Sequence, residues 1–253
     1  MLKVRVIPCL LLQNGRLVKT VKFKNPTYIG DPINAVRIFN DKEVDELLFI
    51  DIEASIQKRG PDYELIAKIS NEVFMPFGYG GGVRSLEDVK KLTRLGVEKV
   101  CINSYAIENP DFISQAADIS GSQSIVAAVD VKKDFFGKDC VYHHINGKNT
   151  LWDVVEYVSM LEQKGAGEIL LNSVDRDGTL AGYDIDLLKK VISVLTIPVI
   201  ALGGAGSINH FVSAVNEAKV SAVAAGSFFV FYGTHRAVLV TYPEKGELRK
   251  CLK

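Results

Sequence analysis

Short runs of apolar residues alternate with amphipathic segments along the whole chain. The apolar runs are nearly continuous and rich in Val, Ile, Leu and Ala, which is typical of parallel strands that are covered on both faces. We expect eight strands, at about residues 4–11, 46–52, 73–79, 99–103, 124–130, 168–172, 197–202 and 221–226. Apolar residues recur at a helical period between them. We expect helices at about residues 31–44, 62–73, 85–96, 109–120, 151–165, 184–195 and 207–218.

Eight strands that alternate with helices favour an α/β fold in which a parallel sheet closes into a (β/α)₈ TIM barrel. An open, doubly wound sheet is the alternative. The length of 253 residues suits one barrel, so we expect a single domain over residues 1–253.

The arrangement of glycines and polar residues in the first half of the chain recurs in the second half. Residues 80–89 correspond to residues 203–212, and residues 48–55 correspond to residues 170–177. A recurrence of this kind indicates a structural repeat. We therefore expect two half-barrels, at about residues 1–120 and 121–253.

Glycines follow an apolar strand and precede a helix start at one place in each half. Backbone N–H groups can approach an anion closely at such a turn. Glycines that only permit a tight turn are the alternative, but the same pattern at two symmetric positions favours two phosphate-binding sites. Their candidate residues are Gly81, Gly82, Asn103, Ser104, Asp177, Gly178, Gly203, Gly204, Gly226 and Ser227.

Carboxylates stand at or just after the ends of three predicted strands, at Asp51, Asp130 and Asp177. The carboxyl ends of barrel strands form the active-site mouth, where a carboxylate can act as a general acid or base. Ordering of a loop is the alternative role, and it is least convincing for Asp130, which follows an apolar run directly. The residue that corresponds to Asp130 in the first half is Leu11, so only one half carries a carboxylate at this place.

Two loops near the mouth are also notable. Residues 13–30 read as a long basic loop, which could close on a phosphate or could simply be solvated. His143 and His144 are expected in a surface hairpin, and no acid or third histidine is spaced to complete a metal site with them. The basic residues of the first loop are Arg16, Lys19, Lys22 and Lys24.

Four charged residues fall at strand starts, at the opposite end of the expected barrel. Buried charges are tolerated only when they are paired, and two of these are basic and two acidic. They could plug the barrel floor, or they could form a gate through which a small molecule enters. They are Arg5, Glu46, Lys99 and Glu168.

Composition narrows the class of protein. The 30 basic and 30 acidic residues balance, which argues against nucleic acid or an anionic membrane as a partner. No apolar stretch is long enough to span a bilayer. The four cysteines are scattered, so we expect no disulfide framework, no zinc site and a reducing, cytoplasmic location. Nothing indicates a cofactor.

Several long segments are similar to those of one known family, at residues 30–55, 79–103, 121–130, 164–179 and 203–211. Through these segments, the chain resembles the cyclase subunit of imidazole glycerol phosphate synthase from residue 1 to about residue 232. The resemblance implies a (β/α)₈ barrel of the lyase class that binds a glutaminase subunit at its N-terminal face. Ammonia would pass the four floor charges and add to a bisphosphate nucleotide at the mouth, with Asp130 catalytic and Lys19 in a substrate loop.

The departures from the family pattern are informative. Leu11 stands where the family carries an aspartate that pairs with Asp130, Asn172 stands where it carries threonine, and no long final helix is evident. Leucine cannot transfer a proton. Asp51 and Ser173 complete the expected mouth. These features resemble a branch found with surface-polysaccharide (lipopolysaccharide) genes, which implies a separate ATP-dependent amidotransferase as a further partner.

Three hypotheses follow. The first is a barrel subunit of an ammonia-channelling complex that supplies nitrogen for an acetamidino sugar and has lost or changed its own cyclase activity. The second is a working cyclase of histidine biosynthesis, which makes imidazole glycerol phosphate and an aminoimidazole carboxamide ribonucleotide. The third is a non-catalytic scaffold that binds a phosphorylated ligand.

Overall fold

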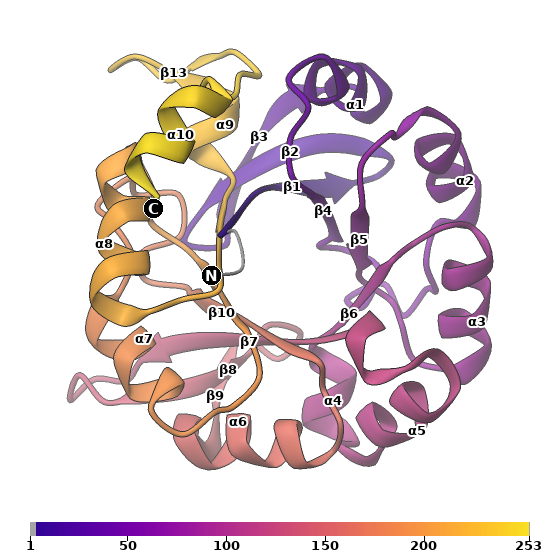
Figure 1. Ribbon diagram of the computed structural model, residues 1–253. Helices are drawn as coiled ribbons and strands as arrows, with labels where there is room; N and C mark the ends of the chain where they lie inside the picture. Colours follow the sequence, from indigo (N-terminus) through magenta and orange to yellow (C-terminus); the bar gives the residue numbers. More distant parts are fainter. Residues whose placement is uncertain (1–3, 253) are drawn as a thin grey trace.

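The structure is a computed structural model that describes residues 4–252 of the chain, and in it eight parallel strands form a closed barrel (Figure 1). The first barrel strand pairs with the last, and β7 pairs with β10. This closure confirms the TIM barrel and excludes the open sheet. In their order around the barrel, the strands are β1 (Arg5–Gln13), β4 (Leu47–Asp51), β5 (Phe77–Gly80), β6 (Lys99–Ile102), β7 (Ile125–Lys133), β10 (Glu168–Ser173), β11 (Val199–Leu202) and β12 (Ala222–Ala225).

Helices surround the barrel, and their starts follow from local sequence. Ser85 and Asp88 form a reciprocal capping box at the start of α3. Aspartate side chains cap four further helices by accepting a backbone N–H. The helices are α1 (Pro32–Asp41), α2 (Tyr63–Glu72), α3 (Leu86–Arg94), α4 (Ser104–Glu108), α5 (Asp111–Ser120), the 3₁₀ turn η1 (Ser122–Ser124), α6 (Val154–Gln163), α7 (Ile185–Ile192), α8 (Ile208–Ala218), α9 (Ser227–Val230) and α10 (Lys245–Cys251).

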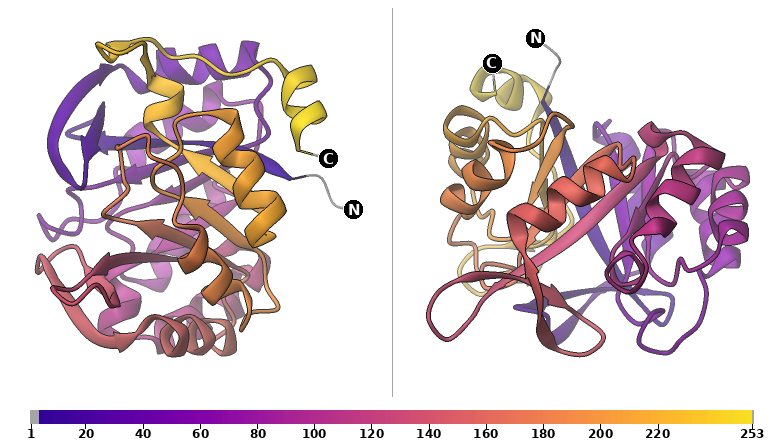
Figure 2. Two further views of the ribbon diagram at one scale, coloured as in Figure 1. Left: turned by 90° about the vertical axis from the view of Figure 1, so that its left-hand side faces the viewer. Right: turned by 90° about the horizontal axis from the view of Figure 1, so that it is seen from below.

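Three hairpins project on the side of the barrel opposite the chain ends (Figure 2, left view). The prediction of a loop over residues 13–30 is wrong, because this segment continues β1 as two antiparallel strands. The predicted hairpin after the fifth barrel strand is present, but His143 is buried in it rather than exposed. The hairpins are β2 (Arg16–Val21) with β3 (Lys24–Gly30), β8 (Asp139–His143) with β9 (Lys148–Asp153), and β13 (Phe231–Tyr232) with β14 (Ala237–Val238).

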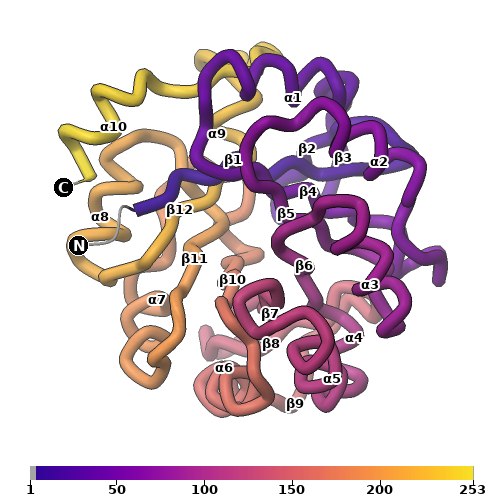
Figure 3. Tube along the Cα trace, turned by 45° about the vertical axis from the view of Figure 1, so that its right-hand side comes forward, coloured from indigo at the N-terminus to yellow at the C-terminus, as the bar shows by residue number. Residues whose placement is uncertain are grey.

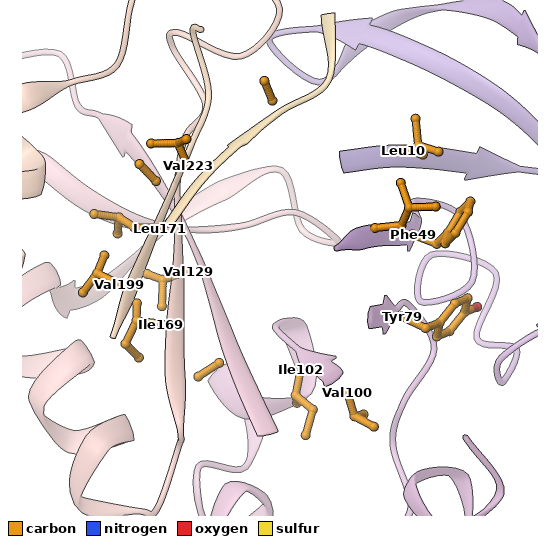
Figure 4. Close-up of a cluster of buried hydrophobic side chains, with 14 of the residues drawn as sticks. Leu10, Phe49, Tyr79, Val100, Ile102, Val129, Ile169, Leu171, Val199 and Val223 are labelled. Carbon is orange, nitrogen blue, oxygen red and sulfur yellow. The ribbon is translucent and has the colours of Figure 1, made fainter. Parts of the chain in front are cut away.

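The apolar residues form two layers, one outside the strands and one inside the barrel. The outer layer lies between strands and helices and includes Phe49, Tyr79 and Leu171 (Figure 4). The inner layer is a separate cluster of smaller and mostly aliphatic residues. Alternate residues of each strand therefore serve different layers, as the period of two in a strand requires. The inner cluster contains Ile7, Cys9, Leu48, Cys101, Val126, Leu170, Ile200, Ala222 and Ala224.

The C-terminal segment returns to the face where the barrel strands begin. Helix α10 lies beside α8, near the start of β1 (Figure 3), and the Tyr242 hydroxyl donates a hydrogen bond to the Val6 carbonyl at 3.1 Å. The final helix has seven residues, so the expectation that no long helix ends the chain agrees with the structure. Among the described residues, no helix has the length and apolar character needed to cross a membrane.

Candidate active site

A cavity opens at the carboxyl ends of the barrel strands and continues down between them toward Cys9 and Leu170. The space between its atoms is about 1100 Å³, open solvent at the mouth included. Binding sites of barrel enzymes lie at this end of the strands. Residues from both halves of the chain line the cavity. Those that the sequence singled out are Leu11, Lys19, Asp51, Gly81, Gly82, Asn103, Ser104, Asp130, Asn172, Asp177 and Gly226.

Asp130 is buried at the centre of this group and is held by two side-chain amides. Asn103 Nδ2 donates to one carboxylate oxygen at 2.7 Å, and Asn172 Nδ2 donates to the other at 2.9 Å. Burial raises the pKa of Asp130 above its usual value, against the hydrogen bond from Asn172, which lowers it. The geometry orients one carboxyl group firmly and favours its protonated form more than solvent would.

Replacing Asp130 with asparagine is expected to raise the free energy of unfolding at pH 7 by about 1 kcal/mol. The folded-state pKa lies above the unfolded one, so wild-type stability falls as pH rises from the unfolded pKa through the folded pKa. The gain should therefore vanish below about pH 4, the ordinary aspartate pKa. Urea denaturation at several pH values measures it. Asp111→Asn, at an exposed ion pair with Lys164, is the control. A less stable Asp130→Asn at pH 7 would contradict this prediction.

The other two carboxylates of the cavity are ion-paired. Asp51 accepts two hydrogen bonds from Arg59, at 2.8 and 3.0 Å, and also accepts from the N–H of Ala54. Asp177 accepts from Lys19. Leu11 lines the same cavity with an aliphatic side chain. Of the three lining carboxylates, Asp130 is therefore the one whose hydrogen-bond partners are neutral side chains. The corresponding residue in the first half, Leu11, is not an acid.

Lys19 is buried and bonded to Asp177, which is far from it in sequence. Its Nζ lies 2.9 Å from Asp177 Oδ1 and 2.8 Å from the Thr20 carbonyl oxygen. The lysine stem packs against Gly226, where an added Cβ would lie 2.8 Å from Lys19 Cε. The β2–β3 hairpin is therefore anchored to the mouth through this ion pair.

The two glycine turns have the same local geometry. Gly81 and Gly203 have φ angles of +115° and +93°, and an added Cβ would lie 2.4 Å from the Asp51 carbonyl and 2.6 Å from the Ser173 carbonyl, respectively. Only glycine fits such a position. We name Gly81, Gly82, Asn103 and Ser104 the first cradle, and Asp177, Gly178, Gly203, Gly204, Gly226 and Ser227 the second cradle. Phosphate binding at either one remains a prediction.

The four charges at the barrel floor form a connected ion-pair network. Arg5 lies 2.6 Å from Glu46 and 3.0 Å from Glu168, which in turn lies 3.0 Å from Lys99. Burial raises the pKa of Glu46, and the charge of Arg5 opposes that rise. The sequence analysis singled out these four residues. The structure joins them through three ion pairs at the end of the barrel where the strands begin.

Other residues of the mouth were missed by the sequence analysis. The ring of Phe23, at the tip of the β2–β3 hairpin, meets the ring of His144 edge-on at 5.4 Å between centroids. Two hairpins thus meet at the rim of the cavity. Asn103 was assigned to a phosphate site, yet its side-chain amide is bonded to Asp130. Its place directly after β6, which pairs with β7, was the available signal. The other missed lining residues include Thr20, Ser55 and Tyr105.

The fold and site define an α/β barrel with a ligand cavity at one end and an ion-paired floor at the other. The histidine biosynthesis protein family matches residues 5–236. A Pseudomonas aeruginosa protein, provisionally named imidazole glycerol phosphate synthase subunit hisF2, is 51% identical over 248 residues, 98% of this chain and 99% of the relative. A provisionally named subunit HisF of Leptospira interrogans is 49% identical over 97% of each chain.

A third relative, from Vibrio vulnificus and provisionally named imidazole glycerol phosphate synthase subunit hisF3, is 46% identical over 254 residues. It covers all of this chain and 98% of its own length. The chain belongs to the histidine biosynthesis protein family and, within it, to the HisF-like cyclase family of imidazole glycerol phosphate synthase.

Proposed function

We propose that this chain is the barrel subunit of a glutamine-dependent complex, through which ammonia passes from a glutaminase at the floor to the mouth. The observation that carries the proposal is the complete floor network of Arg5, Glu46, Lys99 and Glu168 below a mouth that has one oriented acid and no second one at Leu11. All four charged residues of the floor are present, whereas the pair of carboxylates expected of the cyclase lacks one member, because position 11 is leucine.

The inner layer of the barrel suits the passage of a small neutral molecule. Its walls are aliphatic or thiol side chains such as Cys9, Cys101 and Ala224. An ammonium ion would lose its hydration there without a compensating charge, so the neutral ammonia molecule is favoured. The floor network must part for passage, and the Lys99–Glu168 pair can open while Arg5 stays bonded to both glutamates.

At the mouth, we propose that a phosphorylated ligand binds across the two cradles and that ammonia continues to a separate acceptor enzyme. Leu11 supports this, since general acid–base groups supply about 10²–10⁴-fold in rate and one of the expected pair is missing. The resemblance to the polysaccharide-associated branch suggests an ATP-dependent amidotransferase that makes an acetamidino sugar.

The test is a titration of this chain into a glutaminase subunit of the imidazole glycerol phosphate synthase type, with glutamate formation as the readout. We expect glutamine hydrolysis to rise and to saturate at one barrel per glutaminase. Lys99→Met, at the floor, should change the stimulation. Lys132→Met is the matched control, because that lysine lies over the ring of Tyr142 on the β8–β9 hairpin. No complex and no stimulation would refute the proposal.

The floor network also predicts a stability effect. Glu168→Gln removes the charge that joins Arg5 and Lys99, and should lower the free energy of unfolding by roughly 1–3 kcal/mol; a fully buried pair would cost more, but both cations are partly exposed. Urea denaturation measures the change. Glu72→Gln, at an exposed pair with Arg37, is the matched control and should have little effect. Equal effects of the two variants would contradict the buried network.

A working cyclase of histidine biosynthesis is the second candidate. The orientation of Asp130 by two amides and the presence of both glycine cradles favour it. It predicts growth of a histidine auxotroph that lacks the cyclase when this chain is expressed. Absence of growth with a folded, soluble chain would count against it.

A further inference from the structure

A guanidinium group, that of Arg236, lies at the second cradle without a carboxylate partner among the described residues. Arg236 Nη1 donates to the Gly178 carbonyl at 2.9 Å, and Nη2 donates to Ser227 Oγ at 3.4 Å. Both acceptors belong to the second cradle. The guanidinium carbon lies over the ring of Phe231, 4.5 Å from its centroid. Within residues 4–252, no acidic side chain lies within ion-pair distance of Arg236.

The cations beside the first cradle are neutralised. Arg59 lies 2.8 Å from Asp51, and Arg84 lies 3.1 Å from Glu108. In addition, the N–H of Gly82 already donates to the Ser55 hydroxyl at 3.2 Å. The first cradle thus offers an anion less free positive charge than its glycines alone suggest.

The second cradle differs from the first in the charge that surrounds it. Its other nearby cations, Lys19 and Arg176, are paired with Asp177 and Asp184. Over the described range, the backbone N–H groups of Gly204 and Gly226 have no backbone acceptor. A half-buried cation without a counter-charge beside free N–H groups is the chemistry that an anion completes.

The backbone at Arg236 forms a tight turn between β13 and β14. Its φ angle is +52°, in the left-handed region that residues other than glycine rarely adopt. The turn is held by a hydrogen bond from the Arg236 N–H to the Gly233 carbonyl at 3.1 Å. This turn of the β13–β14 hairpin positions the Arg236 side chain against Gly178 and Ser227 of the second cradle.

We propose that Arg236 is the cationic clamp of the second cradle and that this cradle binds a phosphate monoester group more tightly than the first. The inference rests on the phosphorylated ligand of the proposed function and adds a binding residue from the C-terminal hairpin. The planar fork of arginine can donate two parallel hydrogen bonds to phosphate, whereas lysine acts as a point charge. The ligand is thereby oriented, with its more tightly held phosphate at the second cradle.

The test is isothermal titration calorimetry of the full chain with inorganic phosphate at low ionic strength. We expect two unequal sites in the wild type. Arg236→Met should weaken the tighter one by about 10- to 100-fold, the range for a lost hydrogen bond to a charged group. The affinity of the tighter site in Arg236→Lys should lie between that of the wild type and that of Arg236→Met. Arg84→Met, at the first cradle, is the matched control and should leave the tighter site within about twofold.

Unchanged affinity of the tighter site in Arg236→Met, or no phosphate binding by the folded wild type, overturns the proposal. Thermal unfolding without phosphate checks that each variant is folded. If Arg236→Met does not fold, Arg236→Lys decides, because it keeps the charge and a long stem but loses the fork. Glutaminase stimulation is measured without phosphate and is therefore an independent test. If phosphate binding depends on Arg236 but the chain does not stimulate the glutaminase, the proposed function is refuted and the phosphate proposal stands.

Discussion

Replacing Leu11 with aspartate is expected to raise the formation of imidazole glycerol phosphate from the nucleotide substrate and ammonium salts by about 10²-fold or more. Leu11 and Asp130 line the same cavity. A second carboxylate there would face Asp130 across the cavity, because β1 and β7 lie four strands apart in either direction around the barrel. One group could then act as acid while the other acts as base. Product formation, followed with time at saturating ammonium, measures the effect.

Leu11→Asn is the matched control for that experiment. It places a polar side chain of the same size at the same position but cannot transfer a proton, so it should stay at the wild-type rate. Adding Asp130→Asn to Leu11→Asp should abolish the gain. A wild-type rate already equal to that of Leu11→Asp would contradict the account and favour the working cyclase.

The second large effect concerns stability. Asp177→Ala is expected to lower the free energy of unfolding by about 3–5 kcal/mol, the cost of leaving one member of a buried ion pair without its partner. Lys19 is 5% exposed, and its Nζ has the Thr20 carbonyl as its other acceptor. Urea denaturation of the purified variant measures the loss.

A double variant separates the ion pair from packing. Lys19→Met with Asp177→Leu replaces the pair by apolar side chains and should recover most of the stability, since such replacements are often neutral or favourable. A loss below about 1 kcal/mol for Asp177→Ala alone would show that the lysine reaches solvent. The β2–β3 hairpin would then be less firmly anchored than the structure indicates.

The barrel could be predicted because each of its strands is apolar on both faces and the intervening helices have clear periodicity. The β2–β3 hairpin could not. Residues 24–28 of β3 are all exposed, so no apolar alternation distinguishes this strand from a basic loop. Its pairing depends on β2, which continues directly from β1.

The composition of the mouth was predictable, whereas its contacts were not. Strand ends and the internal repeat identified Asp130, Leu11 and both glycine turns. The pairing of Lys19 with Asp177 joins residues 158 positions apart, and nothing local to either one indicates it. Arg236 lies just beyond the residues over which the resemblance was recognised, 1 to about 232, so neither the repeat nor the resemblance pointed to it.

The most direct test of the account is to measure glutamate and imidazole glycerol phosphate in one mixture that contains this chain, the glutaminase, glutamine and the nucleotide. We expect glutamate formation to rise when the chain is added, while imidazole glycerol phosphate stays near the background. Imidazole glycerol phosphate formed in equal amount to glutamate would contradict the loss of cyclase chemistry. Glutamate formation that the chain does not change would contradict the passage of ammonia.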